Sequence, residues 1–235
     1  LTNARHELGQ AAALTWATKD GLAMIGGLVY SYVASPKFDE NVKEFRLFAD
    51  IINDVGLTFD MLAPYFRNHL LIVSSAAVLC KTLCGISAGA TKSSITQHFA
   101  IAGNMADLNA KESTQETLMS LIGMILGIYA AMALHRYETI YGSASTLNWS
   151  IFAVLTLIHV WANYKGVELL RMRTLNRARA DIVLAKVVKQ AMGASGDYRK
   201  LLESIPPPCD VHESLFKSSW RILYPKQSLQ LGVPL

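Results

Sequence analysis

The sequence predicts an all-α fold, a multi-helix membrane-associated bundle that carries a short C-terminal docking tail. The 235 residues are 51% hydrophobic and 17% charged, whereas an ordinary globular chain is about 25% charged. The mean hydropathy is +0.26, and the charge deficit falls almost entirely in the middle of the chain. Helix-forming residues dominate, and β-branched runs of alternating polarity are lacking. These observations favour helices that contact a membrane.

The N-terminal part predicts two helices. Residues 3–18 are rich in alanine and leucine, and the helix is expected to end near Gly21. Residues 21–35 carry no charge but are short for a bilayer span. They predict a core helix or half-span that stops at Pro36.

Residues 39–63 form the clearest amphipathic helix, which Pro64 terminates. Arg46 and Asp50 lie four residues apart, and this spacing predicts an ion pair. Apolar residues surround much of the helix, so its polar stripe is expected to face other protein. The stripe consists of Arg46, Asp50, Asn53 and Asp54.

Three apolar segments predict membrane insertion. They are residues 70–90, with Lys81 as the one charge, and the uncharged residues 117–134 and 139–164. A bilayer core needs about 20 apolar residues in a helix. The alternative is a soluble bundle of fully buried helices, and Lys81 and His159 weaken two of the spans.

A basic run follows the third apolar segment. Positive charge near a membrane exit marks the side that is not translocated and attracts anionic headgroups. Without a membrane the same run would be a solvated helix face. No nucleic acid is expected as a partner, because the aromatic residues and motifs of such proteins are missing. The basic residues are Lys165, Arg171, Arg173, Arg177 and Arg179.

Two Gly-x-x-x-Gly motifs lie in the apolar segments and predict close helix packing. They are Gly85 with Gly89 and Gly123 with Gly127. Small residues at this spacing let helix backbones approach each other closely. On this basis Gly89→Leu is expected to be worse for stability than Ser87→Leu.

The most polar part of the middle of the chain is residues 91–117. One interpretation is a substrate or ion site between helices, because polar side chains near membrane depth are often functional. The alternative is interhelical hydrogen bonding plus caps, and Ser113 with Glu116 has the spacing of a capping box. The candidate polar cluster consists of Lys81, Gln97, His98, Asn104, Asp107 and Lys111.

Enzyme templates are missing, so we expect a protein that is not an enzyme and has no cofactor. The sequence has no phosphate-binding glycine loop, His-Glu-x-x-His or dinucleotide fingerprint. Its Gly-x-Ser-x-Gly spacing, Gly85 to Gly89, lies inside an apolar helical segment and not at the strand-to-helix turn of a nucleophile elbow. Cys80 and Cys84 are interpreted as buried small hydrophobes rather than metal ligands. A soluble pyridoxal-phosphate enzyme with a Schiff base on Lys19 or Lys111 is the least favoured alternative.

The chain is expected to have two parts. Residues 1–192 form the helical membrane domain, and residues 193–235 form a linker and a short tail. The prolines 206–208 mark the linker. The tail is too small to fold alone and is expected to dock onto the body or a partner.

Several blocks of the sequence resemble the root UVB sensitive (RUS) family, in order over roughly residues 10–185. Lys92 stands where the family's arginine is expected, and Ser113-Thr114 where it commonly has Gly-Ser; both changes are mild. The part that usually precedes the blocks is missing, so the numbering is expected to begin inside a longer precursor. The blocks include Leu14-Thr-Trp16, Phe45-Arg46-Leu-Phe-Ala-Asp50, Thr96-Gln-His98-Phe-Ala100, Asn104-Met-Ala-Asp107 and Thr174-Leu-Asn176-Arg177.

The resemblance implies a helical membrane-associated protein without an established catalytic activity. Plant members are linked to UV-B sensitivity and vitamin B6 balance, and two members work together as a complex associated with plastids. We therefore expect a scaffold or structural subunit of an organellar membrane assembly, in a plastid or mitochondrial membrane. Its partners would be membrane lipid and other membrane protein subunits, with another member of the family as one candidate. The alternative is a carrier or permease for a small metabolite linked to vitamin B6.

Overall fold

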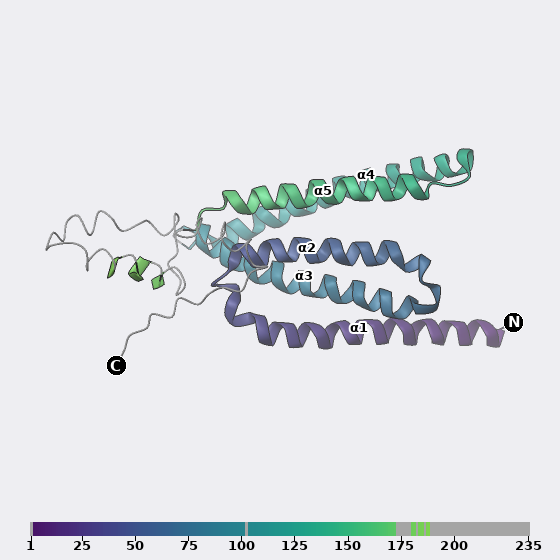
Figure 1. Cartoon of the computed structure of the whole chain (residues 1–235), viewed down its shortest axis with the longest axis horizontal. Coiled ribbons are helices and arrows are strands. Elements are labelled where there is room, and N and C mark those ends of the chain that lie inside the picture. The colour runs from purple at the N-terminus through teal and green to yellow at the C-terminus, as the bar shows by residue number, and fades with distance from the viewer. Residues whose placement is uncertain (1, 102, 173–179, 182, 186, 189–235) are drawn as a thin grey trace. The chain divides into compact units, whose positions relative to one another are not determined.

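The computed structural model describes residues 2–101, 103–172, 180–181, 183–185 and 187–188. Every regular element within these ranges is helical, which confirms the all-α prediction. The long helices follow one another in alternating directions (Figure 1). They are α1 Thr2–Phe38, α2 Val42–Leu62, α3 Leu70–Phe99, α4 Met105–Tyr141 and α5 Ser145–Leu169, with 3-10 turns η1 Ala63–Tyr65 and η2 Arg67–His69 between α2 and α3.

The chain divides into two compact units, residues 1–167 and 168–235. The first unit holds helices α1 to α4 and most of α5. The predicted boundary at residues 192 and 193, the prolines 206–208 and the docking tail lie outside the described residues, as do the basic residues 173–179.

Helix α1 corrects the prediction of two separate N-terminal helices. It runs without interruption through Gly21 and includes Pro36. A glycine in a helix costs about 1 kcal/mol relative to alanine, and packing against α3 offsets such a cost. A Cβ added at Gly27 would lie 2.8 Å from Cγ2 of Thr82 on α3, so the two backbones approach closely here. Pro36 has no N–H to donate to the carbonyl oxygen of Tyr32, but it lies only two residues before the end of the helix, so the interruption affects the last turn alone.

Helices α2 and α3 form an antiparallel hairpin, and α1 packs against α3 (Figure 1). The predicted amphipathic helix over residues 39–63 is confirmed as α2, which ends two residues before Pro64. Leu47 and Ala49 of α2 and Ala77 of α3 are almost completely buried. At Gly56 an added Cβ would lie 3.1 Å from the carbonyl oxygen of Ala77, so α2 and α3 are in close contact at this point.

An aromatic group closes the core where α1 turns into α2. The ring of Phe38 packs edge-on against Phe45, with centroids 4.8 Å apart, and Tyr30 stacks on Phe48 at 6.1 Å. The hydroxyl groups of Tyr30 and Ser87 hydrogen-bond at 2.6 Å and so join α1 to α3. Edge-to-face and offset pairs of this kind add to the energy of area burial.

Helices α4 and α5 differ from the predicted segments at their ends. The third apolar segment, residues 139–164, is divided, because α4 continues to Tyr141 and Gly142 ends it with a left-handed φ of 79°. Glycine adopts this conformation without a Cβ penalty. The predicted capping box at Ser113 and Glu116 is wrong, since α4 has already begun at Met105.

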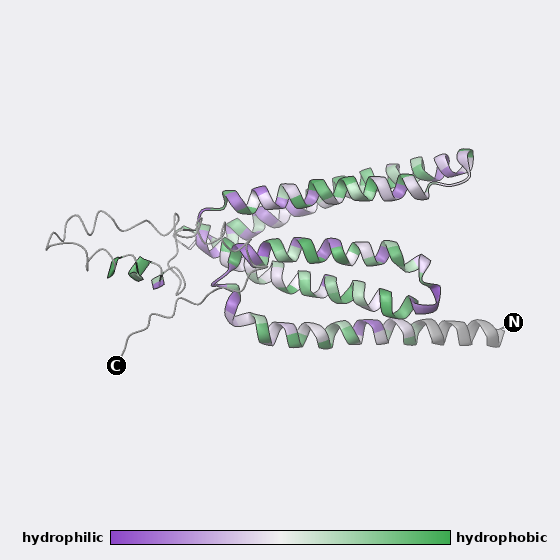
Figure 2. Cartoon of the chain, viewed as in Figure 1, coloured by the Kyte–Doolittle hydropathy of each residue, from purple (hydrophilic) through white to green (hydrophobic). Residues whose placement is uncertain are grey.

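The outer helices expose their apolar side chains. None of the described residues of α4 is buried, and Val167 is the buried residue of α5. Apolar residues cover long stretches of both helices (Figure 2). Among the described residues, three helical segments are long and apolar enough to cross a membrane, Arg67–Phe99, Met105–Tyr141 and Ser145–Leu169.

Candidate functional site between α2 and α5

A contact between Asp54 and His159 joins the polar stripe of α2 to the middle of α5. Nδ1 of His159 lies 2.9 Å from Oδ2 of Asp54. The side chain of Asp54 is 9% exposed and that of His159 is 41% exposed. One turn further along α5, the amide of Asn163 donates to the carbonyl oxygen of His159 at 3.0 Å. The stripe therefore faces protein at this point, as its pattern predicted.

Asp50 lies one turn before Asp54 on the same stripe, and its predicted ion pair with Arg46 is wrong. No salt bridge joins the two among the described residues, although the charge of Arg46 acts on Asp50. Oδ2 of Asp50 is enclosed in the bundle and has no hydrogen-bond partner in the described structure. This burial raises the pKa of Asp50, and the charges of Arg46 and His159 lower it by less.

Cys84 of α3 also belongs to this neighbourhood, since the charges of Asp50, Arg46 and Asp54 act on its thiol. The α2–α5 cluster is defined as Arg46, Asp50, Asp54, Cys84 and His159, and it brings together three helices. Cys80 and Cys84 are partly exposed free thiols. No group of three His, Cys, Asp or Glu side chains suited to a metal ion is present in the part of the chain that the structure describes.

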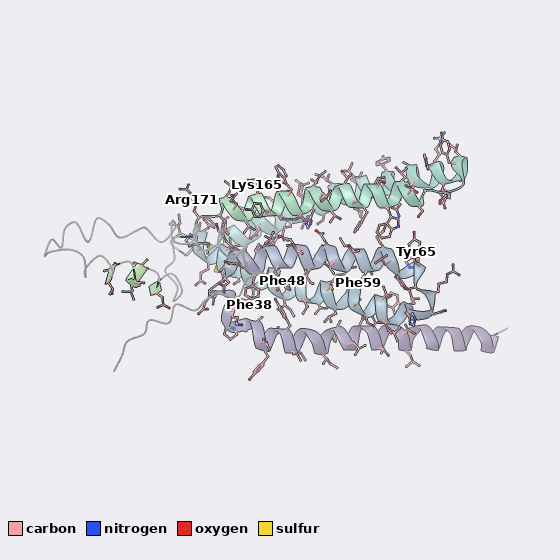
Figure 3. The ribbon with its side chains drawn as sticks, viewed as in Figure 1. Phe38, Phe48, Phe59, Tyr65, Lys165 and Arg171 are labelled. Atoms are coloured by element: carbon pink, nitrogen blue, oxygen red, sulfur yellow. The ribbon has the colours of Figure 1, made fainter. Side chains whose placement is uncertain are left out.

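A second contact with α5 lies at the end of the α2–α3 hairpin. The indole nitrogen of Trp149 donates to the hydroxyl oxygen of Tyr65 at 3.1 Å, and Oγ of Ser145 lies 3.0 Å from the same oxygen. These hydrogen bonds, Ser145 first and then Trp149, lower the pKa of Tyr65. Tyr65 and Lys165 lie toward opposite ends of the first unit (Figure 3). Polar side chains thus hold α5 at two places.

The candidate polar cluster of residues 81–111 does not form one site. Lys81 pairs with Asp60 of α2, and it is sixteen positions before Gln97 on the same straight helix, about 24 Å along the axis. Lys111 pairs with Asp107 at 2.8 Å within the first turns of α4. Oδ1 of Asn104 accepts a bond from the backbone nitrogen of Ile101 at 2.7 Å, and the ring of His98 packs on Phe99 at 5.0 Å. These contacts match the alternative of interhelical bonds and caps.

The contact between α3 and α4 was missed by the sequence analysis. Nζ of Lys92 lies 2.8 Å from Oε1 of Glu116 and 3.6 Å from Oε1 of Glu112. The hydroxyl of Thr96 adds a bond to Glu112 at 3.3 Å. The sequence did hold a signal for this contact. Lys92 and Thr96 lie one turn apart on one helix, and Glu112 and Glu116 lie one turn apart on the next, so the two pairs can meet.

The four glycines of the Gly-x-x-x-Gly motifs do not pack within the described chain. An added Cβ at Gly85, Gly89, Gly123 or Gly127 would meet nothing within 4 Å. The close approaches occur instead at Gly26, Gly27 and Gly56, where α1 and α2 pack on α3. The reason is orientation: Gly85 and Gly89 lie on the exposed side of α3, while α1 and α2 cover its other sides. Packing of these motifs against another chain stays a prediction.

The fold and the side chains between the helices define the class of protein to which this chain belongs. It is an all-α protein whose described part has three helices long and apolar enough to cross a membrane and ionisable side chains between α2 and α5. Over residues 3–191 the chain matches the family described as "Vitamin B6 photo-protection and homoeostasis domain". The chain belongs to this family, the root UVB sensitive (RUS) family, as its sequence blocks predicted.

Relatives support the same assignment. The chain is 34% identical to protein root UVB sensitive 3 of Arabidopsis thaliana over 196 residues, which are 83% of this chain and 43% of that protein. It is 33% identical to RUS family member 1 of Dictyostelium discoideum over 174 residues, 74% of this chain and 32% of that protein. It is 27% identical to protein root UVB sensitive 2, chloroplastic, of Arabidopsis thaliana, over 77% of this chain and 40% of that protein. The chain therefore spans less than half the length of each. No solved structure matches it.

Proposed function

We propose that this chain forms the membrane-embedded part of a non-catalytic RUS family protein that acts as a scaffold or structural subunit of an organellar membrane assembly. The observation that supports this most is α4, a helix of 37 residues in which none of the described residues is buried. Leu126 is 64% exposed and Tyr129 is 67% exposed. Exposed apolar surface on this scale indicates contact with a membrane or a protein partner.

The proposed partners are membrane lipid and other membrane subunits, a second RUS family member among them. The open glycine faces of α3 and α4 are suited to close contact with another helix, because small residues permit backbones to approach. One relative carries the word chloroplastic in its name. On that ground a plastid membrane is the first location to examine, and a mitochondrial membrane the second.

The experiment is to wash native membranes that contain the full-length protein with alkaline carbonate and then to solubilise them in a mild detergent. We expect the protein to stay in the membrane pellet and to migrate in detergent with other subunits, detectable by native mass spectrometry. A protein released by carbonate as a free monomer would contradict membrane embedding. A protein that stays in the pellet but is monomeric and without partners in detergent would contradict the scaffold role alone.

A carrier for a small metabolite is the second candidate, and the α2–α5 cluster favours it. Ionisable side chains between helices at membrane depth often mark a substrate or ion pathway, and the family description names vitamin B6. Vesicles that contain the full-length protein would be tested for uptake of pyridoxine. Uptake that is lost in Asp54→Ala but kept in Asp107→Ala, an exposed residue of the α4 start, is the expected result. Absence of uptake in the unchanged protein would contradict the carrier.

A further inference from the structure

The charges of the α2–α5 cluster do not balance when both acids are ionised. Arg46 supplies one positive charge, and Asp50 and Asp54 supply two negative charges one helical turn apart. Asp54 has His159 as its partner, whereas the enclosed Oδ2 of Asp50 has no donor among the described residues. One negative charge therefore stays uncompensated unless the cluster takes up a proton.

A buried charge without a partner is strongly unfavourable. An ionised carboxylate that is moved away from water without a hydrogen-bond donor loses its hydration uncompensated, and such a group usually takes up a proton instead. A neutral carboxylic acid avoids most of this cost. Asp50 meets the condition at its Oδ2, which is buried and has no hydrogen-bond partner in the described structure.

Each helix packed near Asp50 contributes a charged or titratable side chain to its surroundings. Arg46 and Asp54 come from α2, and His159 comes from α5. Cys84 faces the cluster from α3. Tyr30 of α1 bonds Ser87. A metal ion would need three suitable ligands together, and the described residues offer no such group.

We propose that Asp50 holds an exchangeable proton and that Arg46, Asp50, Asp54 and His159 together form a proton-binding site at the contact of α2 with α5. The ligand is a proton taken from bulk water onto the carboxyl group of Asp50. When it leaves, Asp50 and Asp54 are both ionised one turn apart on α2, with the charge of Arg46 acting on Asp50 and the ring of His159 bonded to Asp54. The site goes beyond a scaffold or carrier role and is compatible with either.

The pH dependence of the folding stability follows from the direction in which the pKa of Asp50 is shifted. Burial raises the pKa of Asp50 above its ordinary value, so the folded protein binds this proton more tightly than the unfolded chain. The stabilising effect of the bound proton is complete below the ordinary aspartate range near 3.9. It is lost as the pH rises through the raised pKa of Asp50.

The test is infrared spectroscopy of the full-length protein in lipid nanodiscs during a pH titration. The C=O stretch of a neutral carboxylic acid should persist above the ordinary aspartate range and disappear in Asp50→Asn. The matched control is Asp60→Asn, which alters an exposed acid of the same helix that pairs with Lys81 and should leave the band unchanged. Helix content measured by circular dichroism verifies that each variant is folded.

Two further variants test the electrostatic role of the cations. Arg46→Gln should move the midpoint of the band to higher pH, and His159→Ala should move it in the same direction by less, because both charges lower the pKa of Asp50 and Arg46 has the larger effect. A band that survives in Asp50→Asn, or that titrates in the ordinary aspartate range, would overturn the proposal. A midpoint that does not respond to Arg46→Gln would overturn the assignment of the site.

Discussion

His159 in the middle of α5 is hydrogen-bonded to Asp54 in the middle of α2, 105 positions earlier in the chain, at 2.9 Å. The side chain of Asp54 is 9% exposed, so loss of the imidazole leaves a buried carboxylate without this donor. We expect His159→Ala to lower the free energy of unfolding by about 1–3 kcal/mol. Thermal unfolding in mild detergent measures the effect. The control is His135→Ala on the exposed surface of α4, and equal losses in the two variants would contradict a structural role for the contact.

The surroundings of Ser87 and Gly89 reverse the order of stability loss that the Gly-x-x-x-Gly motif predicted for leucine substitutions at these two positions. Ser87 is 0% exposed and bonds Tyr30, whereas nothing lies within 4 Å of a Cβ at Gly89. Ser87→Leu should therefore lower the free energy of unfolding by about 2–4 kcal/mol, from overpacking and the lost hydrogen bond, and Gly89→Leu should lower it by less. Thermal stability of the monomer in detergent compares the two. A greater loss in Gly89→Leu would restore the original prediction.

Gly27 and Gly21 offer a matched pair on α1. A Cβ at Gly27 would lie 2.8 Å from Cγ2 of Thr82, whose hydroxyl donates to the carbonyl oxygen of Val78 at 2.9 Å and so fixes the side chain. A Cβ at Gly21 would meet nothing within 4 Å. We expect Gly27→Ala to lower the melting temperature. Gly21→Ala should hold or raise it, since alanine favours a helix by about 1 kcal/mol. A rise in both variants would show that α1 does not pack on α3 at Gly27.

Leu126 tests the lipid contact of α4. It is 64% exposed near the middle of this helix. An arginine at the centre of a spanning helix raises the apparent free energy of insertion by about 3 kcal/mol. A glycosylation-based insertion assay should therefore record less insertion of α4 for Leu126→Arg and little change for Ala110→Arg, in the polar start of the helix. Unchanged insertion of Leu126→Arg would argue against a spanning α4.

The sequence predicted what depends on local pattern. The amphipathic helix around Asp50, the apolar character of the later helices and the stop at Pro64 all follow from spacing along one helix. The prediction that the first helix ends near Gly21 was wrong, because packing of α1 on α3 outweighs the cost of a glycine within the helix.

The remaining features depend on which faces meet in three dimensions. The pairing of His159 with Asp54 joins residues that no periodicity relates, although an ionisable side chain in an apolar helix is a signal that a partner exists. The same holds for glycines: spacing identified Gly85 and Gly89 as small, but the close contact is at Gly56, which has no motif around it.

The central claim is that α3, α4 and α5 cross a membrane. The most direct test is to determine which side of the membrane each end of α4 faces. Single cysteines would be placed by Ala106→Cys and Ser143→Cys, both at exposed positions, in full-length protein whose native cysteines are changed to serine. An impermeant thiol reagent is then added to sealed organelles. If α4 crosses the membrane, one cysteine is labelled from outside and the other only after the membrane is opened. Labelling of both from the same side would contradict the claim.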